Sequence, residues 1–199
     1  MKIYDISQDV FGRKIYHGDP APQKNTLFSI DSGDSYNLTA FSMCAHNGTH
    51  IDAPFHFINN GKTAEKIDLF KCIGFSYVAI HKGILNADDA THILNEARGI
   101  NIEASKRILI KGDAVVSESA AKIFVSHGIY LIGNESQSVG PENAPMNVHK
   151  IFLEKDIVLL EGLRLGDVDE GVYFLSAVPI SLAGSDGAPC RAVLLDGLK

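Results

Sequence analysis

An alternation of strand-like and helix-like segments in the middle of the chain most constrains its fold. From residue 71 to residue 132 the order reads strand, helix, strand, helix, strand. The strand-like segments are short, continuous apolar runs rich in β-branched residues, which is typical of buried strands. Strands that alternate with helices usually pair in parallel through right-handed crossovers. The sequence therefore predicts an α/β architecture.

The same patterns predict where individual elements lie. We expect strands at residues 76–81 (SYVAIH), 107–110 (RILI), 128–132 (GIYLI), 156–160 (DIVLL) and 191–195 (RAVLL). The clearest helices are expected at residues 87–98 and 117–126. Residues suited to cap or end them are Asp88, Asp89 and Gly99 for the first, and Ser117, Ser119 and Gly128 for the second. The flanks are richer in strands and loops, which predicts a mixed sheet.

The size of the chain and its lack of internal divisions predict one domain over residues 1–199. The chain has 199 residues and a mass of 21.5 kDa, enough for one sizeable hydrophobic core, and no repeat or linker divides it. Its formal net charge of -6 argues against a nucleic-acid partner. No apolar run is long enough to span a membrane, and the N-terminus lacks the apolar core of a signal peptide. We therefore expect a cytoplasmic protein.

The cysteines support the same compartment. Cys44, Cys72 and Cys190 are odd in number and widely spaced, which suggests neither a disulfide framework nor a cysteine-based zinc site. Such cysteines are usually small buried hydrophobic residues in a reducing environment.

Residues 46–56, HNGTHIDAPFH, concentrate three of the eight histidines of the chain. Pro54 and weak helix formers disfavour a helix, so we expect an extended segment in which His46, His50, Asp52 and His56 share one face. His50 and Asp52 would lie roughly 6 to 7 Å apart along such a strand and could share a metal ion. His46 would lie roughly 13 Å from His50 unless the Asn-Gly pair at residues 47–48 supplies a bend.

Imidazole and carboxylate ligands together suit a divalent transition metal ion. They match zinc, manganese or iron better than calcium or magnesium, and zinc is the first expectation. A single histidine in a loop is usually only solvated or hydrogen-bonded, but three histidines and an aspartate at same-face spacing indicate a site. His81, His92 and His127 stand alone, and for them a structural role is favoured.

The motif HNGTHIDAPFH closely resembles the His-x-Gly-Thr-His-x-Asp-x-Pro-x-His signature of the metal-dependent cyclase-like hydrolases. That family includes bacterial kynurenine formamidase and isatin hydrolase. Other stretches resemble the family as well, so that the resemblance covers essentially the whole chain. They are residues 16–20 (YHGDP), 61–74 (GKTAEKIDLFKCIG), 131–140 (LIGNESQSVG) and 178–196 (VPISLAGSDGAPCRAVLLD).

The resemblance implies a fold and a set of site residues. The fold is a compact α/β domain of the swivelling β/β/α type, with a mixed, barrel-like sheet and flanking helices, assembled as a homodimer or higher homo-oligomer. One or two Zn²⁺ ions are implied, with Mn²⁺ as the other candidate. Their implied ligands are His46, His50 and Asp52 for the first ion, with Asp52 and Glu161 bridging, and His149 for a second ion. A carboxylate directly after the apolar run at 156–160 would also be costly to bury without a cation.

The resemblance further implies hydrolysis of a carbon-nitrogen bond in a small amide, such as an aryl formamide or a cyclic amide. A metal-bound hydroxide would attack the carbonyl, and His56 would transfer the proton as general acid and base. The chain departs from kynurenine formamidase in two places: it has no Trp, so Tyr16 would take the place of the aromatic residue that stacks on the substrate, and the loop at 133–140 differs. Two alternatives remain: a catalytically idle metal-containing protein that binds a small ligand, and a metal-dependent lyase or cyclase.

Overall fold

The structure is a computed structural model that describes residues 1–12 and 15–198. The helices are α1 (Ala87–Ile100), α2 (Glu118–Ser126) and α3 (Met146–Leu153). The strands are β1 (Lys2–Asp5), β2 (Gln23–Phe28), β3 (Leu38–Ser42), β4 (His50–Asp52), β5 (Ile73–Ile80), β6 (Gly83–Leu85), β7 (Arg107–Lys111), β8 (Ala114–Val116), β9 (Leu131–Asn134), β10 (Val158–Glu161), β11 (Gly171–Ser176), β12 (Gly187–Pro189) and β13 (Val193–Asp196).

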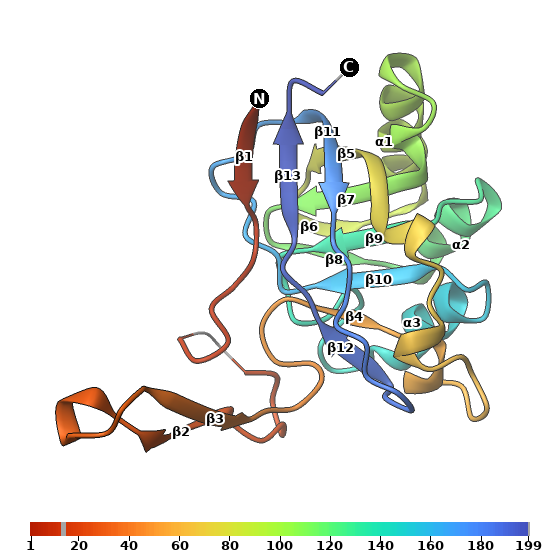
Figure 1. The fold of residues 1–199 in the computed structure, drawn as a ribbon. Helices are drawn as coiled ribbons and strands as arrows, with labels where there is room; N and C mark the ends of the chain where they lie inside the picture. The colour runs from red at the N-terminus through yellow and green to blue at the C-terminus, as the bar shows by residue number, and fades with distance from the viewer. Residues whose placement is uncertain (13–14, 199) are drawn as a thin grey trace.

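A mixed sheet forms the centre of the molecule. Within the described ranges it has nine strands in the order β1-β13-β11-β5-β7-β9-β10-β4-β12, and it curls into a half-barrel (Figure 1). The pairs β5-β7, β7-β9 and β9-β10 are parallel, whereas the other pairs are antiparallel. Helices α1 and α2 follow β5 and β7 in the chain, as the crossovers of an α/β fold require. The predicted α/β architecture and mixed, barrel-like sheet are confirmed.

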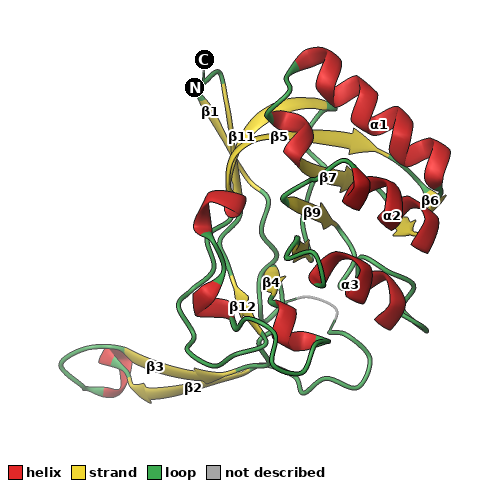
Figure 2. Ribbon diagram, turned by 90° about the vertical axis from the view of Figure 1, so that its right-hand side faces the viewer, coloured by secondary structure: helices red, strands yellow, loops and turns green. Residues whose placement is uncertain are grey.

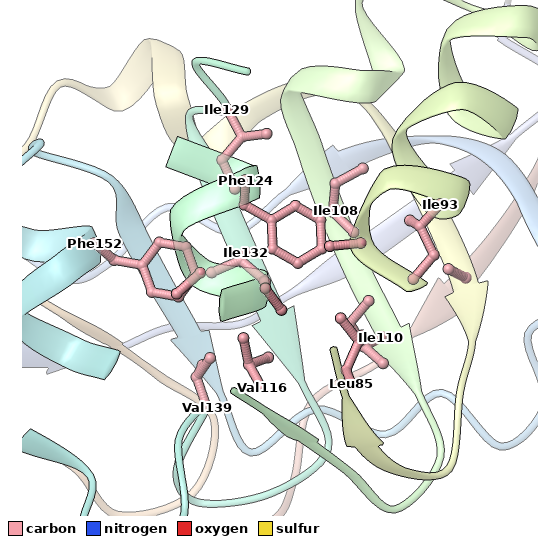
Figure 3. Packing of buried hydrophobic residues seen from close by; sticks show 14 of the residues in the cluster. Leu85, Ile93, Ile108, Ile110, Val116, Phe124, Ile129, Ile132, Val139 and Phe152 are labelled. Carbon is pink, nitrogen blue, oxygen red and sulfur yellow. The ribbon is translucent and has the colours of Figure 1, made fainter. Parts of the chain in front are cut away.

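Both faces of the central strands are buried, which explains their continuous apolar sequences. Ile108 and Ile110 of β7 point into a core beneath the three helices, where they meet Phe124 of α2 (Figure 3). Leu109, between them in sequence, belongs to a second core on the other face of the sheet. Because side chains alternate along a strand, one run of apolar residues serves both cores.

The predicted elements are present, with shifts of a few residues at their ends. The segment predicted at 128–132 forms β9, which starts three and ends two residues later, and the segments at 156–160 and 191–195 likewise start and end later as β10 and β13. Helix α1 is capped by Asn86, with Asp89 completing a capping box, and it continues through Gly99. Ser117 caps α2 as expected, and its side chain accepts a hydrogen bond from the backbone of Ala120.

Two features lie outside the central strands. Strand β4 lies between β10 and β12, antiparallel to both, so three distant parts of the chain meet there. Strands β2 and β3 form a hairpin of their own that extends away from the sheet and helices (Figures 1 and 2). Across the described ranges, no helix is long and apolar enough to cross a membrane.

Candidate metal centre

The motif at residues 46–56 folds as a turn, a short strand and a helical turn in succession. Gly48 has a positive φ of 69° and forms the predicted bend, which brings the rings of His46 and His50 to a centroid distance of 5.0 Å. The prediction of one extended segment is correct for His50–Asp52 and wrong on either side. Pro54 starts a 3₁₀ turn over Pro54–His56, because its fixed φ suits the first position of a helical turn.

The bend and the strand bring the first three predicted ligands together. His46 Nδ1 lies 2.9 Å from Asp52 Oδ1, and His50 Nε2 lies 3.5 Å from the same oxygen. His50 and Asp52 are almost fully buried, and the His46 side chain is only slightly exposed. These three side chains are close enough to bind a single ion.

Sheet pairing and helix α3 bring in the two ligands from the distant part of the chain. Glu161, the last residue of β10, pairs with His50 across the antiparallel strands, and its Oε2 lies 3.5 Å from His50 Nε2. His149 projects from α3, with its Nε2 3.2 Å from Glu161 Oε1 and 3.5 Å from Asp52 Oδ2. The structure therefore places all five sequence-predicted metal ligands in one cluster.

Hydrogen bonds to the backbone orient two of the imidazoles. His50 Nδ1 donates to the Gly48 carbonyl at 3.0 Å, and His149 Nδ1 donates to the Pro145 carbonyl at 2.8 Å. A neutral imidazole has one N–H, so these bonds leave Nε2 of each ring with a lone pair directed at the carboxylates. Metal-binding histidines in proteins are held in this way.

The carboxylates favour positive charge at the centre of the cluster. Burial lowers the pKa of the histidines, but the interactions of their rings with the nearby carboxylates outweigh burial and raise the pKa of His46 and His50 to about 10 and that of His149 to about 9. Burial opposes ionisation of Asp52 and Glu161, yet hydrogen bonds from the histidines hold the pKa of both carboxyl groups below its usual range. Protonated imidazoles or a cation can supply the charge.

Two unpaired atoms favour a cation at this position. His50 Nε2 and Asp52 Oδ2 are buried, and neither has a hydrogen-bond partner in the described part of the chain. An unpaired buried polar atom is costly, and two that face one cluster fit a shared ion. The donor set of three imidazole nitrogens and two carboxylates fits zinc or manganese and lacks the oxygen-rich character of a calcium site.

His56 and Tyr16 lie on the wall of a cavity beside the cluster. The cavity has a volume of about 200 Å³, and its other lining residues are Asp19, His46, His50, Phe57, Gln137, Ser138, Pro145, His149 and Glu161. The ring of His56 lies 4.1 Å from that of His46, measured between centroids. The Tyr16 hydroxyl donates to the Glu142 carbonyl at 2.8 Å, which fixes the ring at the cavity wall.

One residue of the site, Asp186, was not predicted from the sequence. It directly precedes β12, and its Oδ2 lies 3.0 Å from His46 Nε2 and 3.1 Å from His56 Nδ1. The stretch at 178–196 resembles the family, but an aspartate in a Ser-Asp-Gly loop has no distinctive spacing to the motif at 46–56. Only the pairing of β12 with β4 brings the two segments together.

Comparisons with known proteins identify the family of the chain. Residues 4–141 match the family model "Putative cyclase". The kynurenine formamidase of Erythrobacter litoralis is 31% identical to this chain over 207 residues, which cover 97% of this chain and 93% of the relative. The kynurenine formamidase of Bacillus anthracis is 30% identical over 207 residues, with 97% of each chain covered.

Solved structures share the fold over the full chain. A structure described as a potential metal-dependent hydrolase with cyclase activity superimposes with a TM-score of 0.82 and 27% identity, covering 100% of this chain and 99% of that one. Isatin hydrolase A from Labrenzia aggregata superimposes with a TM-score of 0.80 and 16% identity, covering 97% and 93%, and at that identity it supports the fold alone. With the family model and the relatives, these findings establish that the chain belongs to the cyclase family of metal-dependent hydrolases.

Proposed function

We propose that this protein is a metal-dependent hydrolase that cleaves the carbon-nitrogen bond of a small amide, with aryl formamides and cyclic amides as the first candidates. The observation that carries the proposal is a buried cluster of three imidazoles and two carboxylates, with a further histidine, His56, on the wall of the adjoining cavity. The name of the curated relatives, kynurenine formamidase, supports the same bond type.

The residues proposed to hold the metal are those of the cluster. His46, His50 and Asp52 would hold one ion, and Asp52, His149 and Glu161 form a second group that could hold another. We propose Zn²⁺, with Mn²⁺ as the alternative. When bound, such an ion would supply an activated water and polarise the substrate carbonyl.

His56 is proposed to transfer the proton. Its Nδ1 donates to Asp186, so in the neutral ring Nε2 can accept a proton from the attacking water. The same nitrogen can then donate that proton to the leaving amine nitrogen. His56 is more exposed than the other histidines of the site, as contact with a substrate requires.

The cavity supports a small substrate with an aromatic part. Its volume of about 200 Å³ is below the range usual for drug-sized ligands. Tyr16 and Phe57 supply aromatic surface to the cavity wall, and Pro145 adds apolar surface. We propose that the aromatic part of the substrate packs against Tyr16 while its amide faces the cluster.

A substrate screen with a matched pair of variants tests the proposal. The panel contains formanilides, isatin and cyclic imides, each assayed with added zinc or manganese. We expect turnover by the wild type, and His56→Ala should lower kcat by about 10²- to 10⁴-fold because a general acid-base group is lost. His92→Ala, at an exposed histidine of α1, should leave kcat unchanged.

Three results would contradict the hydrolase proposal. Elemental analysis that finds no transition metal in the purified protein would contradict metal-dependent hydrolysis. Metal binding without turnover of any substrate, and with ligand binding unaffected in His56→Ala, would indicate an idle binding protein. Turnover without entry of oxygen from labelled water into the product would indicate a lyase or cyclase.

We also propose that the chain associates with a second copy of itself. The β2-β3 hairpin carries exposed large apolar side chains, and an isolated two-stranded hairpin is marginally stable in water. These side chains are Leu27, Phe28, Ile30, Tyr36, Leu38 and Phe41. Contact with the same surface of a second copy would cover them, and light scattering on the purified protein measures the mass.

A further inference from the structure

The backbone fixes where the Asp186 carboxylate lies. The Asp186 carbonyl accepts a hydrogen bond from the Ala53 amide at 2.9 Å, and the next residue, Gly187, pairs with Asp52 across β12 and β4. The loop before β12 is thus attached to the strand that carries the metal-binding motif. Its carboxylate reaches the cluster from the side opposite to β10, since β4 lies between β10 and β12.

A single oxygen of Asp186 accepts from two imidazoles with different roles. Both nitrogens of His46 face carboxylate oxygens, Nδ1 at 2.9 Å from Asp52 Oδ1 and Nε2 at 3.0 Å from Asp186 Oδ2, so both donate when the ring is protonated. An ion bound in the cluster would take the place of the Nδ1 proton, and Nε2–H would still donate to Asp186. Carboxylates that accept from the outer N–H of a metal-binding histidine orient the ring and increase its basicity.

The second bond sets the proton position on His56. Nδ1 of His56 lies 3.1 Å from Asp186 Oδ2, and a carboxylate can only accept, so the ring proton must lie on Nδ1. The other nitrogen, Nε2, is then unprotonated in the neutral ring. The 4.1 Å approach of the His56 and His46 rings keeps the proton-transfer group beside a metal ligand.

We propose that Asp186 is a positioning residue that holds His56 in the Nδ1–H tautomer and ties its ring to the ring of His46. The proposal rests on the proposed hydrolase function for its kinetic consequence, whereas the tautomer itself is independent of substrate. The Asp186 carboxylate would do for His56 what a buried carboxylate does for the histidine of a hydrolytic triad. Asp186 itself does not contact the reacting atoms.

Nitrogen NMR of the zinc-loaded protein with ¹⁵N-labelled histidine tests the tautomer directly. The His56 signals are assigned by their loss in His56→Gln. We expect one protonated nitrogen at Nδ1 and one unprotonated nitrogen at Nε2 in the wild type. In Asp186→Asn the amide NH₂ can donate to Nδ1, so we expect the two tautomers to mix or to exchange places.

Steady-state kinetics with saturating zinc test whether loss of the Asp186 carboxylate slows the reaction. Asp186→Asn should lower kcat by about 10- to 100-fold with KM changed by less than about threefold, because outer carboxylate partners of metal-site histidines have effects of this size. Asp167→Asn, at an exposed aspartate remote from the cavity, serves as the matched control and should change neither constant. Asp186→Glu keeps an acceptor and should recover part of kcat.

Each contrary result has a distinct meaning. An Nε2–H tautomer in wild-type His56, or full kcat in Asp186→Asn, overturns the positioning role. Full recovery of the variant by excess zinc also overturns it, since Asp186 would then act on the metal through His46 alone. If the wild type turns over no substrate while its NMR shows the Nδ1–H tautomer, the hydrolase proposal fails and the orientation of His56 by Asp186 stands.

Discussion

Asp156, in the turn before β10, combines a left-handed backbone conformation with two ion pairs. It has a left-handed φ of 58°, and its Oδ2 lies 2.7 Å from both Lys62 Nζ and Lys71 Nζ. The Lys71 ammonium also donates to the Asp156 carbonyl. These bonds connect the segment that follows His56 to the strand that ends in Glu161.

Asp156→Asn should lower the free energy of unfolding by about 0.5 to 1 kcal/mol near pH 7, the range of a partly exposed ion pair. Burial raises the pKa of Asp156, but hydrogen bonds from Lys62 and Lys71 outweigh it and lower the pKa below the ordinary value of 3.8. The stabilisation is therefore complete above pH 3.8 and is lost as pH falls through the lower folded pKa. Asparagine tolerates the left-handed backbone, so the variant isolates the charge.

Urea unfolding of both proteins between pH 7 and pH 2.5 measures this difference. The two stabilities should converge as pH falls, because protonation makes wild-type Asp156 as neutral as asparagine. A difference that stays constant over the whole pH range would mean that charge does not account for it.

The candidate site residues that spacing alone indicates lie close together in the sequence. His46, His50, Asp52 and His56 lie within eleven residues, and their types and spacing alone indicate a metal site. Asp186 could not be found in this way. Its role depends on the pairing of β12 with β4, a contact between residues more than 130 positions apart in the chain.

At the scale of the elements, the close packing of β12 against the turn that carries His46 determines the shape of the site. A Cβ atom added at Gly187 would lie 2.6 Å from His46 Cε1 and 2.9 Å from the Ile51 carbonyl oxygen. Neither distance is tolerated, so a side chain at this position must displace the imidazole or separate the two strands.

Gly187→Ala should therefore weaken zinc binding at least about tenfold and destabilise the fold by about 1 to 3 kcal/mol, as overpacking does. Competition against a chelating dye measures the affinity, and thermal unfolding measures the stability. Gly166→Ala is the matched control, because its added Cβ meets no atom within 4 Å among the residues described. Unchanged zinc affinity in Gly187→Ala would contradict the expected displacement of the His46 ring.

The elements that were predicted correctly are those stabilised by continuous local patterns. Strands β5, β7 and β9 are apolar runs, and α1 and α2 have clear N-cap residues. Helix α3 was not predicted, since it follows a stretch with prolines and asparagines and has no side-chain cap. Its stability comes from Phe152 and its neighbours in the core, a tertiary effect that periodicity over eight residues does not reveal.

At the scale of the whole molecule, the β2-β3 hairpin is the basis of the proposed self-association. Leu27→Asp combined with Ile30→Asp places two charges on its exposed apolar surface, and such charges oppose burial in an interface. We expect the mass in solution to fall from that of an oligomer to that of one chain. Light scattering coupled to size-exclusion chromatography measures it.

Ile84→Asp provides the control, because Ile84 is also apolar and is more exposed than Leu27 and Ile30, but lies on β6, outside the hairpin. It should leave the mass unchanged. A wild-type protein that is a single chain at micromolar concentration would contradict the self-association proposal and leave the site itself unaffected.

The two ends of the hairpin join the rest of the chain within a few residues of the cavity lining. Its first strand begins four residues after Asp19, a cavity-lining residue, and its second strand ends four residues before His46. Excising the hairpin would connect these points directly and disturb the cavity together with any subunit contact. Substitutions within the hairpin, away from both attachment points, are therefore the better test of whether a single chain is active.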